Sequence, residues 1–112
     1  MRIAIPLAEG KLSAHFGHCR SFALFDVDPD EKTVLRQQVL DAPEHAPGLL
    51  PSWLGRHGVD LVIAGGMGRR AQGFFDEGGV KVVTGAPPEA PERIVDAYLE
   101  GTLAIGGNIC DH

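Results

Sequence analysis

The stretch VDLVIAGGMGRRAQGFFDEGGVKVVTG (residues 59–85) holds two apolar runs separated by a polar segment that ends in paired glycines. Its first run, residues 59–66, is nearly continuous in apolar residues, which is typical of a strand buried on both faces of a sheet. Residues 67–79 predict a helix closed by glycine, and residues 80–85 predict a second buried strand. A strand, a helix and a strand in this order indicate an α/β domain.

The segments on either side complete the element order. Three strands are predicted on the N-terminal side: RIAIPL (residues 2–7), SFALFDVD (residues 21–28) and its hairpin partner TVLRQQVL (residues 33–40). Residues 48–58 predict a helix before the first buried strand, and residues 87–101 predict a helix that begins with proline and ends at glycine. The order βββαβαβα predicts a mixed five-stranded sheet flanked by helices, in a single domain over residues 1–112.

Composition narrows the class of protein. The 112 residues carry a formal net charge of −5 and a sequence pI of about 5.4. Nucleic-acid-binding proteins usually present a basic face, so this balance argues against nucleic acid as a partner. No segment approaches the ~20 consecutive apolar residues that span a bilayer, and the N-terminus lacks the pattern of a signal peptide. We therefore expect a cytoplasmic protein without a membrane partner.

Three predicted loops should meet at one end of the sheet. The loop after the first strand contains SAHFGHC (residues 13–19), the loop after the fourth contains AGGMGRR (residues 64–70), and Gly85 follows the fifth. In open α/β sheets, ligands bind beyond the carboxyl ends of the parallel strands. We expect the first two loops to lie side by side and to form a binding site.

The glycine-rich loop has the character of an anion site. Its glycines, which let the backbone pass close to a ligand, are Gly65, Gly66 and Gly68. The helix that follows offers free N–H groups and the positive end of its dipole, and Arg69 and Arg70 add charge there. Lys11 and Arg20 flank the first loop. Basic residues thus gather in two loops of an acidic chain, although a glycine-rich turn alone is weak support for anion binding.

The loop of residues 13–19 is dense in metal-ligating residue types. His15, His18 and Cys19 lie within it, and Cys110 and His112 close the chain. Imidazole and sulfur ligands suit zinc, copper and iron–sulfur species, but this spacing matches no standard zinc motif. The alternative is that the histidines are surface residues and that Cys19 is a small buried hydrophobe.

Three stretches together resemble a known family. SAHFGHCRSFALFDVD, the stretch of residues 59–85 and AYLEGTLAIGGNICDH resemble the dinitrogenase iron–molybdenum cofactor biosynthesis family, whose small domain also occurs as NifX and as the C-terminal part of NifB. The resemblance implies a ribonuclease-H-like fold that binds an anionic metal–sulfur cluster, either the iron–molybdenum cofactor or its Fe–Mo–S precursor. It also implies cluster-assembly proteins as partners. The chain is similar as well to the orange-protein branch, which holds a Mo–Cu–S cluster without covalent attachment.

The resemblance assigns a role to particular residues. The positions that match the family's pattern are Ser13, His15, Phe16, Gly17, Gly65, Gly66, Met67 and Gly68. His18, Arg69 and Arg70 complete the predicted binding set on the charge argument above. The predicted metal ligands are His15, His18, Cys19, Cys110 and His112. The positions of Cys19, Cys110 and His112 vary in the family.

Three functions from different classes follow. The favoured one is a non-catalytic carrier of an anionic metal–sulfur cluster, expected as a monomer or weak dimer. The second is a thiol enzyme that uses Cys19 with His15 or His18. A nuclease is disfavoured because the first strand has none of the carboxylates that such enzymes use to hold metal ions, and the radical chemistry of full-length NifB is excluded because there is no C-x-x-x-C-x-x-C motif. The third is a regulatory protein without cargo.

Overall fold

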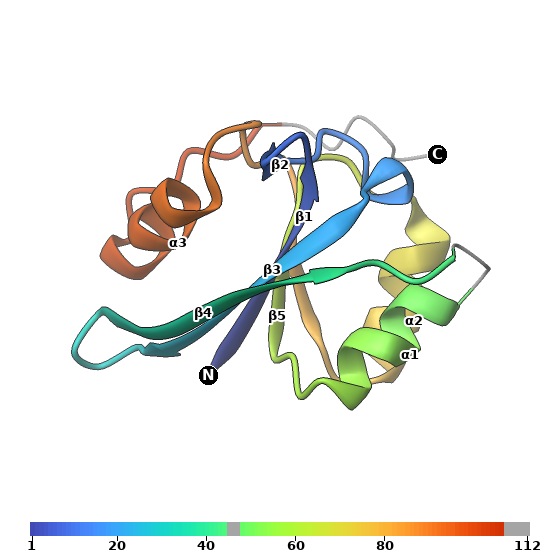
Figure 1. Cartoon of the computed structure of the whole chain (residues 1–112), viewed down its shortest axis with the longest axis horizontal. Helices are drawn as coiled ribbons and strands as arrows, with labels where there is room; N and C mark the ends of the chain where they lie inside the picture. The colour runs from blue at the N-terminus through green and yellow to red at the C-terminus, as the bar shows by residue number, and fades with distance from the viewer. Residues whose placement is uncertain (45–47, 107–112) are drawn as a thin grey trace.

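A computed structural model describes residues 1–44 and 48–106 (Figure 1). Its strands are β1 (Arg2–Ala8), β2 (Lys11–Leu12), β3 (Ser21–Asp28), β4 (Thr33–Asp41), β5 (Leu61–Ile63) and β6 (Lys81–Val83). Its helices are the 3-10 turn η1 (Phe16–His18), α1 (Leu49–Arg56), α2 (Arg69–Glu77) and α3 (Pro91–Glu100). The predicted order βββαβαβα is confirmed once the two short elements of the first loop, β2 and η1, are added. No helix in the described ranges is long and apolar enough to cross a membrane.

The sheet is mixed, with the strand order β4-β3-β1-β5-β6. β1 and β6 run parallel to β5, and β3 runs antiparallel to both β1 and β4. The prediction of five strands was wrong by one, because Lys11 and Leu12 fold back onto β1 as a sixth strand. A two-residue turn at Glu9 and Gly10, both at positive φ, makes this hairpin. Glutamate rarely adopts that conformation, so the sequence carried little sign of the turn.

Helices cover both faces of the sheet, with α1 and α2 on one side and α3 on the other (Figure 1). The core is accordingly divided. The cluster between the sheet and helices α1 and α2 includes Phe22, Leu24, Leu54, Val62 and Phe75. The cluster between the sheet and α3 includes Ile3, Ile5, Phe25, Ile63 and Ile94. Because both faces are covered, the central strands are buried except at the two end residues of β1, as their continuous apolar sequence predicted.

The loop after β1 is joined to the loop after β5 by backbone pairing. His15 and Gly66 form a parallel bridge: the Phe16 N–H donates to the Gly66 carbonyl at 2.8 Å, and the Gly66 N–H donates to the Ala14 carbonyl at 2.7 Å. A Cβ at Gly65 would lie only 2.9 Å from the Ala14 carbonyl oxygen. The prediction that these two loops lie side by side is confirmed, and only glycine fits where their backbones come closest.

The loop after β6 joins the same end of the sheet. The Gly85 N–H donates to the Gly65 carbonyl, and the Gly106 N–H donates to the Gly85 carbonyl, both at 2.7 Å. Gly85 has a φ of 83°, and a Cβ there would collide with the Gly106 backbone. All three loops therefore converge, and the segment after α3 returns to them.

An ion pair closes the opposite end of the sheet. The Arg2 guanidinium donates two hydrogen bonds to the Asp26 carboxylate, from Nε at 2.7 Å and from Nη2 at 3.2 Å. Its Nη1 also donates to the His57 carbonyl at 2.6 Å, which ties β1 to the end of α1. The hydrogen bonds from Arg2 lower the pKa of Asp26.

We expect Gly65→Ala to lower the free energy of unfolding by about 1–3 kcal/mol, because a methyl group overpacks the joint between the loops. Urea unfolding followed by Trp53 fluorescence measures the change. Gly73→Ala is the matched control, since a Cβ in the middle of α2 meets nothing within 4 Å. The control should stabilise the protein by roughly 0.5–1 kcal/mol. Equal effects of the two variants would contradict the overpacking argument.

We expect Asp26→Asn to reduce the free energy of unfolding at pH 7 by about 1 kcal/mol, the range of a partly exposed ion pair. The pKa of Asp26 is lower in the folded protein. The Asp26 carboxylate therefore stabilises the folded protein fully above the pKa that Asp26 has in the unfolded chain, about 3.9. This stabilisation is lost as the pH falls through the pKa that Asp26 has in the folded protein. The stabilities of parent and variant should converge in acid. Urea titrations at several pH values test this, with the exposed Asp96→Asn as control; a difference that is constant with pH would refute it.

Candidate functional site

Two imidazoles stand at the surface where the loops converge. His15 is half-buried and His18 is exposed, and their ring centroids lie 5.3 Å apart. Both belong to the turn around η1, in which the His18 N–H donates to the His15 carbonyl at 3.0 Å. Phe16 anchors this turn, because its buried ring packs against the rings of Phe22 and Phe75. The turn therefore presents both histidines while its aromatic residue holds it to the core.

Ser13 supports the loop from inside. Its side chain is buried, and its hydroxyl donates to the His15 carbonyl at 2.8 Å. The Ser13 N–H donates to the Pro6 carbonyl of β1 at 2.7 Å. Ser13 thus positions His15 without offering its own hydroxyl to a ligand at the surface.

Cys19 faces the core. It is 4 % exposed and lies in the cluster under α1 and α2 that includes Phe16 and Phe22. Burial raises the pKa of the Cys19 thiol to about 11. The position of Cys19 does not support the prediction that it is a metal ligand at the surface, because its side chain is directed into the core.

The spacing of residues in this loop agrees with the burial of Cys19. A 3-10 turn repeats every three residues, so residues three apart lie on the same side. Phe16 and the C-cap Cys19, whose N–H donates to the Phe16 carbonyl, are one turn apart, and both are buried. His15 and His18 are also three residues apart, and both reach the surface. Reading the loop with this period would have assigned Cys19 to the core beside Phe16.

The glycine-rich turn is used inside the protein, because the Gly66 N–H and the Gly65 and Gly66 carbonyls are hydrogen-bonded to neighbouring loops. Gly65 and Gly66 are buried in the loop joint, and the Met67 side chain is 1 % exposed within the core. Gln72, one turn into α2, donates from Nε2 to the Met67 carbonyl at 2.9 Å and so holds the turn against the helix. Sequence reasoning missed Gln72, because nothing in the motif distinguishes it from a surface residue of α2.

The start of α2 is electropositive. Arg69 and Arg70 are exposed in its first turn, which contains no acidic residue, and the N-cap Gly68 supplies no side-chain hydrogen bond. Helices usually carry acidic residues in this position, because their N-terminus is the positive end of the dipole. In Figure 1 the start of α2 lies beside η1, as the bridge between His15 and Gly66 requires. The end of the molecule with the histidines therefore also carries two arginines at the positive end of a helix dipole.

The described residues do not assemble a set of metal ligands. Among residues 1–44 and 48–106, no three His, Cys, Asp or Glu side chains are grouped so as to hold a metal ion. Cys110 and His112, the other predicted ligands, lie outside the described residues. The arrangement offers two imidazoles, two guanidinium groups and the exposed backbone of Gly17. Such groups contact an anion by hydrogen bonds and charge.

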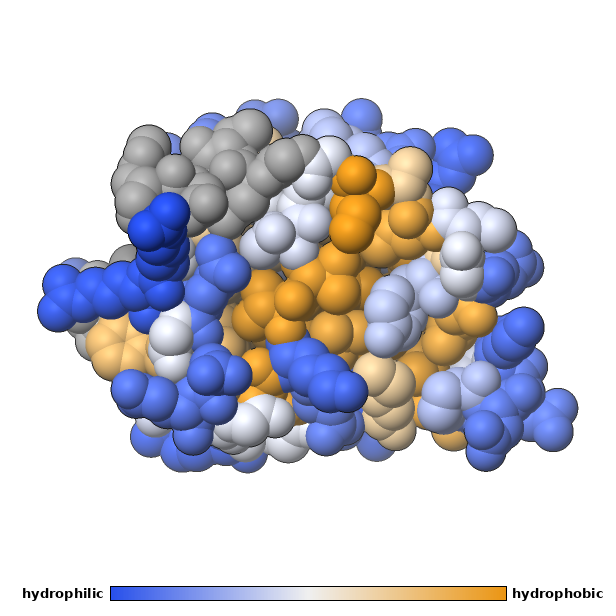
Figure 2. Space-filling model, turned by 180° about the vertical axis from the view of Figure 1, so that it is seen from behind, coloured by the Kyte–Doolittle hydropathy of each residue, from blue (hydrophilic) through white to orange (hydrophobic). Residues whose placement is uncertain are grey.

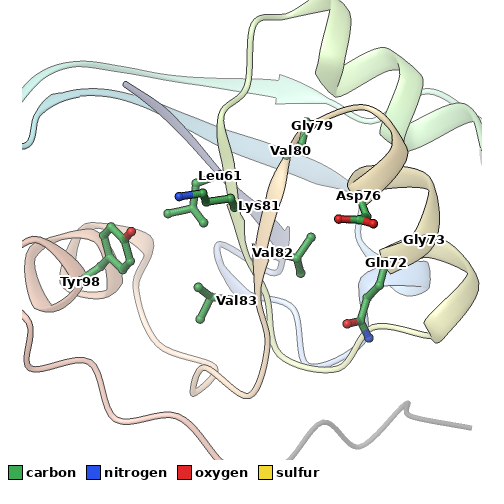
Figure 3. Close-up of a pocket in the computed structure, with 10 residues that line it drawn as sticks. All are labelled: Leu61, Gln72, Gly73, Asp76, Gly79, Val80, Lys81, Val82, Val83 and Tyr98. Carbon is green, nitrogen blue, oxygen red and sulfur yellow. The ribbon is translucent and has the colours of Figure 1, made fainter.

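A separate hollow of about 690 Å³ lies beside β6, between α2 and α3. Figure 2 shows apolar surface on this side of the molecule, where Leu61, Val82 and Val83 line the hollow. In Figure 3, Tyr98 lies across the strand from Gln72 and Asp76, so the polar groups do not converge on one point. None of the predicted site residues lines it.

Comparison with known proteins identifies the family. The sequence profile described as dinitrogenase iron-molybdenum cofactor matches residues 1–101, which is most of the chain. A relative, the uncharacterized protein MJ0580 of Methanocaldococcus jannaschii, is 26% identical over 106 residues, covering 92% of this chain and 89% of its own.

Solved structures share the fold. The crystal structure of PH0822 is 33% identical, with a TM-score of 0.86 and coverage of 94% of both chains. The apo form of the orange protein from Desulfovibrio gigas is 20% identical, with a TM-score of 0.71 and coverage of 96% of this chain and 93% of that one. At that identity the second likeness concerns the fold alone. On the match over residues 1–101, this chain belongs to the dinitrogenase iron-molybdenum cofactor family.

Proposed function

We propose that this protein is a non-catalytic carrier that binds an anionic metal–sulfur cluster during cluster assembly or storage. Membership of the family supports a role in iron–molybdenum cofactor biosynthesis or cluster binding. The observation that carries the proposal is the pairing of His15 with Gly66, which brings the imidazole pair and the basic start of α2 together. A local group of basic residues on a chain of net charge −5 favours a small anion over a large acidic partner.

Different residues would make different kinds of contact with such a cluster. His15 and His18 can donate imidazole N–H groups to sulfide or oxo ligands, or bind a metal at the cluster's edge. Arg69 and Arg70 supply charge and strong hydrogen-bond donors. Gly17 leaves the surface between the histidines free of a side chain, so that a cluster can approach the backbone. This donor set suits reversible, non-covalent binding of an Fe–Mo–S precursor or a Mo–Cu–S cluster.

The surroundings of Cys19 weigh against the thiol enzyme. A nucleophilic cysteine needs a lowered pKa and access to its substrate. Cys19 has neither, because burial raises its pKa to about 11 and leaves it 4 % exposed. Arg69 and Arg70 weigh against a regulatory protein without cargo. Each lies at the N-terminus of α2, where the helix dipole disfavours a positive charge by roughly 0.3–1 kcal/mol of stability, a loss that a bound anionic ligand would offset.

Binding of tetrathiomolybdate, a small molybdenum–sulfur dianion, tests the proposal. We expect Arg69→Ala with Arg70→Ala to weaken binding about tenfold at low ionic strength, and much less once the Debye length falls to ~3 Å near 1 M salt. His15→Ala with His18→Ala should weaken binding at every ionic strength, because it removes hydrogen-bond donors as well. Anaerobic titration followed by the absorption spectrum of the anion measures both effects.

A control with the same change in net charge is Arg56→Ala with Lys81→Ala, since both residues are exposed and lie towards the other end of the parallel strands. It should bind nearly as well as the parent. The proposed site is wrong if the control loses as much affinity as the arginine variant, or if the histidine variant binds with the parent's affinity and spectrum. Trp53 fluorescence verifies that each variant is folded.

The thiol enzyme is tested by alkylation. In a Cys110→Ser background, we expect Cys19 to react with iodoacetamide at pH 7 at least a hundredfold more slowly in the folded protein than in urea, because a pKa of about 11 leaves on the order of one thiol in ten thousand ionised. Mass spectrometry of timed samples measures the rates. Fast alkylation of the folded protein would favour the enzyme instead.

A further inference from the structure

The strand β6 leaves one edge of the sheet open. It is the last strand in the order β4-β3-β1-β5-β6 and, among the described strands, pairs with β5 alone. The hollow of about 690 Å³ lies beside it, with α2 on one side and α3 on the other (Figure 3). None of the residues proposed to hold a cluster lines this hollow, so it belongs to a different surface of the molecule.

Backbone hydrogen-bonding groups of β6 face this open edge. The Lys81 N–H donates to the Asp60 carbonyl at 3.1 Å, and the Val83 carbonyl accepts from the Ala64 N–H at 2.8 Å. Lys81 and Val83 therefore direct their backbone groups toward β5, in a register that is unbroken over its three pairs. Because backbone groups alternate in direction along a strand, the N–H and C=O of Val82 point away from β5. Another strand could exchange two hydrogen bonds with them.

The side chains beside the hollow alternate between its two sides. Lys81 and Val83 point to the α3 side, where Tyr98 forms the wall, and Val82 points to the α2 side, where Asp76 lies (Figure 3). Polar groups thus stand on both sides of β6 and do not surround one point. This arrangement suits an extended chain, whose own side chains alternate in direction, better than a compact ligand.

The helix α2 leaves room for such a chain. Gly73 lies in the middle of this helix, where glycine is less favourable than alanine. A Cβ at Gly73 would meet nothing within 4 Å, so packing inside the protein does not require glycine there. Gly73 does line the hollow, and a larger side chain would project into it.

The charges beside β6 indicate which residues an added segment carries. Lys81 is exposed on a short edge strand, where lysine opposes pairing with segments that bring no opposite charge. Three consecutive residues of an antiparallel segment would face Val83, Val82 and Lys81 in turn. An apolar residue matches Val83 and Tyr98, a basic residue lies on the side of Asp76, and an acidic residue pairs with Lys81.

We propose that the open edge of β6 binds an extended segment of a partner protein, antiparallel to β6, with an apolar, a basic and an acidic residue at three consecutive positions. The backbone of the segment exchanges two hydrogen bonds with Val82, and its side chains alternate between the two sides of the hollow. The contact is small, and interfaces below about 1,200 Å² are weak and transient. The proposal goes beyond cluster binding and does not depend on it.

Titration with a short peptide, followed by the backbone amide resonances in NMR spectra, tests the pairing. The probe is the acetylated and amidated pentapeptide Thr-Val-Lys-Glu-Thr, added up to about 5 mM. We expect saturable binding with a Kd of about 1 mM and the largest shifts at Val82 and its neighbours. N-methylation of the peptide's lysine removes the N–H that donates to the Val82 carbonyl and should weaken binding about fivefold or more. N-methylation of its glutamate should have less effect, because that N–H points away from β6.

A charge swap tests the match to Lys81. Lys81→Glu should weaken binding of the probe at least threefold, and a peptide with lysine in place of glutamate should bind this variant more tightly than the probe does. Arg36→Glu is the matched control, because it makes the same change of charge at an exposed residue of β4, the opposite edge of the sheet. It should bind the probe nearly as well as the parent.

Gly73→Leu tests the room beside α2. Leucine is a better helix former than glycine, so this variant should be at least as stable as the parent to urea while it binds the probe several times more weakly. The proposal is overturned if the parent shows no saturable binding, if both N-methylated peptides bind alike, or if Arg36→Glu loses as much affinity as Lys81→Glu. Shifts at Val82 on dilution of the protein alone would identify a second copy as the occupant and would overturn it too.

Discussion

The backbone contact at Gly65 is the constraint on which the functional end of this protein depends. Two loops that are about fifty residues apart in sequence pass so closely here that a single methyl group would press on the Ala14 carbonyl. The bridge between His15 and Gly66 is an isolated parallel pairing between the loop after β2 and the loop after β5, and it extends the sheet beyond its named strands. Everything proposed for the site depends on this extension, because it sets the imidazole pair beside the basic start of α2.

Sequence reasoning succeeded where the signals were periodic or topological. The order of strands and helices followed from apolar runs and glycine or proline boundaries, and the meeting of the loops followed from the geometry of parallel sheets. It failed where one local conformation decides the outcome. The turn at Glu9 requires a positive φ that glutamate seldom adopts, and it converted part of an expected loop into β2.

The inward direction of Cys19 was a failure of a different kind. The residue types suggested a ligand, whereas the three-residue repeat of η1 assigns Cys19 to the buried side with Phe16. Met67 illustrates the same limit, because a motif shows which residues are present and not which of its side chains reach the surface. Chemical type and local periodicity have to be read together before a loop residue is given a role.

The site is shared between distant segments, and this has a thermodynamic consequence. His15 and Arg69 come together only when β1 and β5 are paired, so the unfolded chain contains no pre-formed version of the site. A ligand that binds there binds the folded state alone, and it stabilises that state by RT ln(1 + [L]/Kd). At a free ligand concentration a hundred times the Kd, the gain is about 2.7 kcal/mol, a large part of the stability of a small domain. The fraction of protein with bound ligand and the free energy of unfolding would then rise together. The protein without ligand would unfold most readily and would be cleaved fastest by proteases.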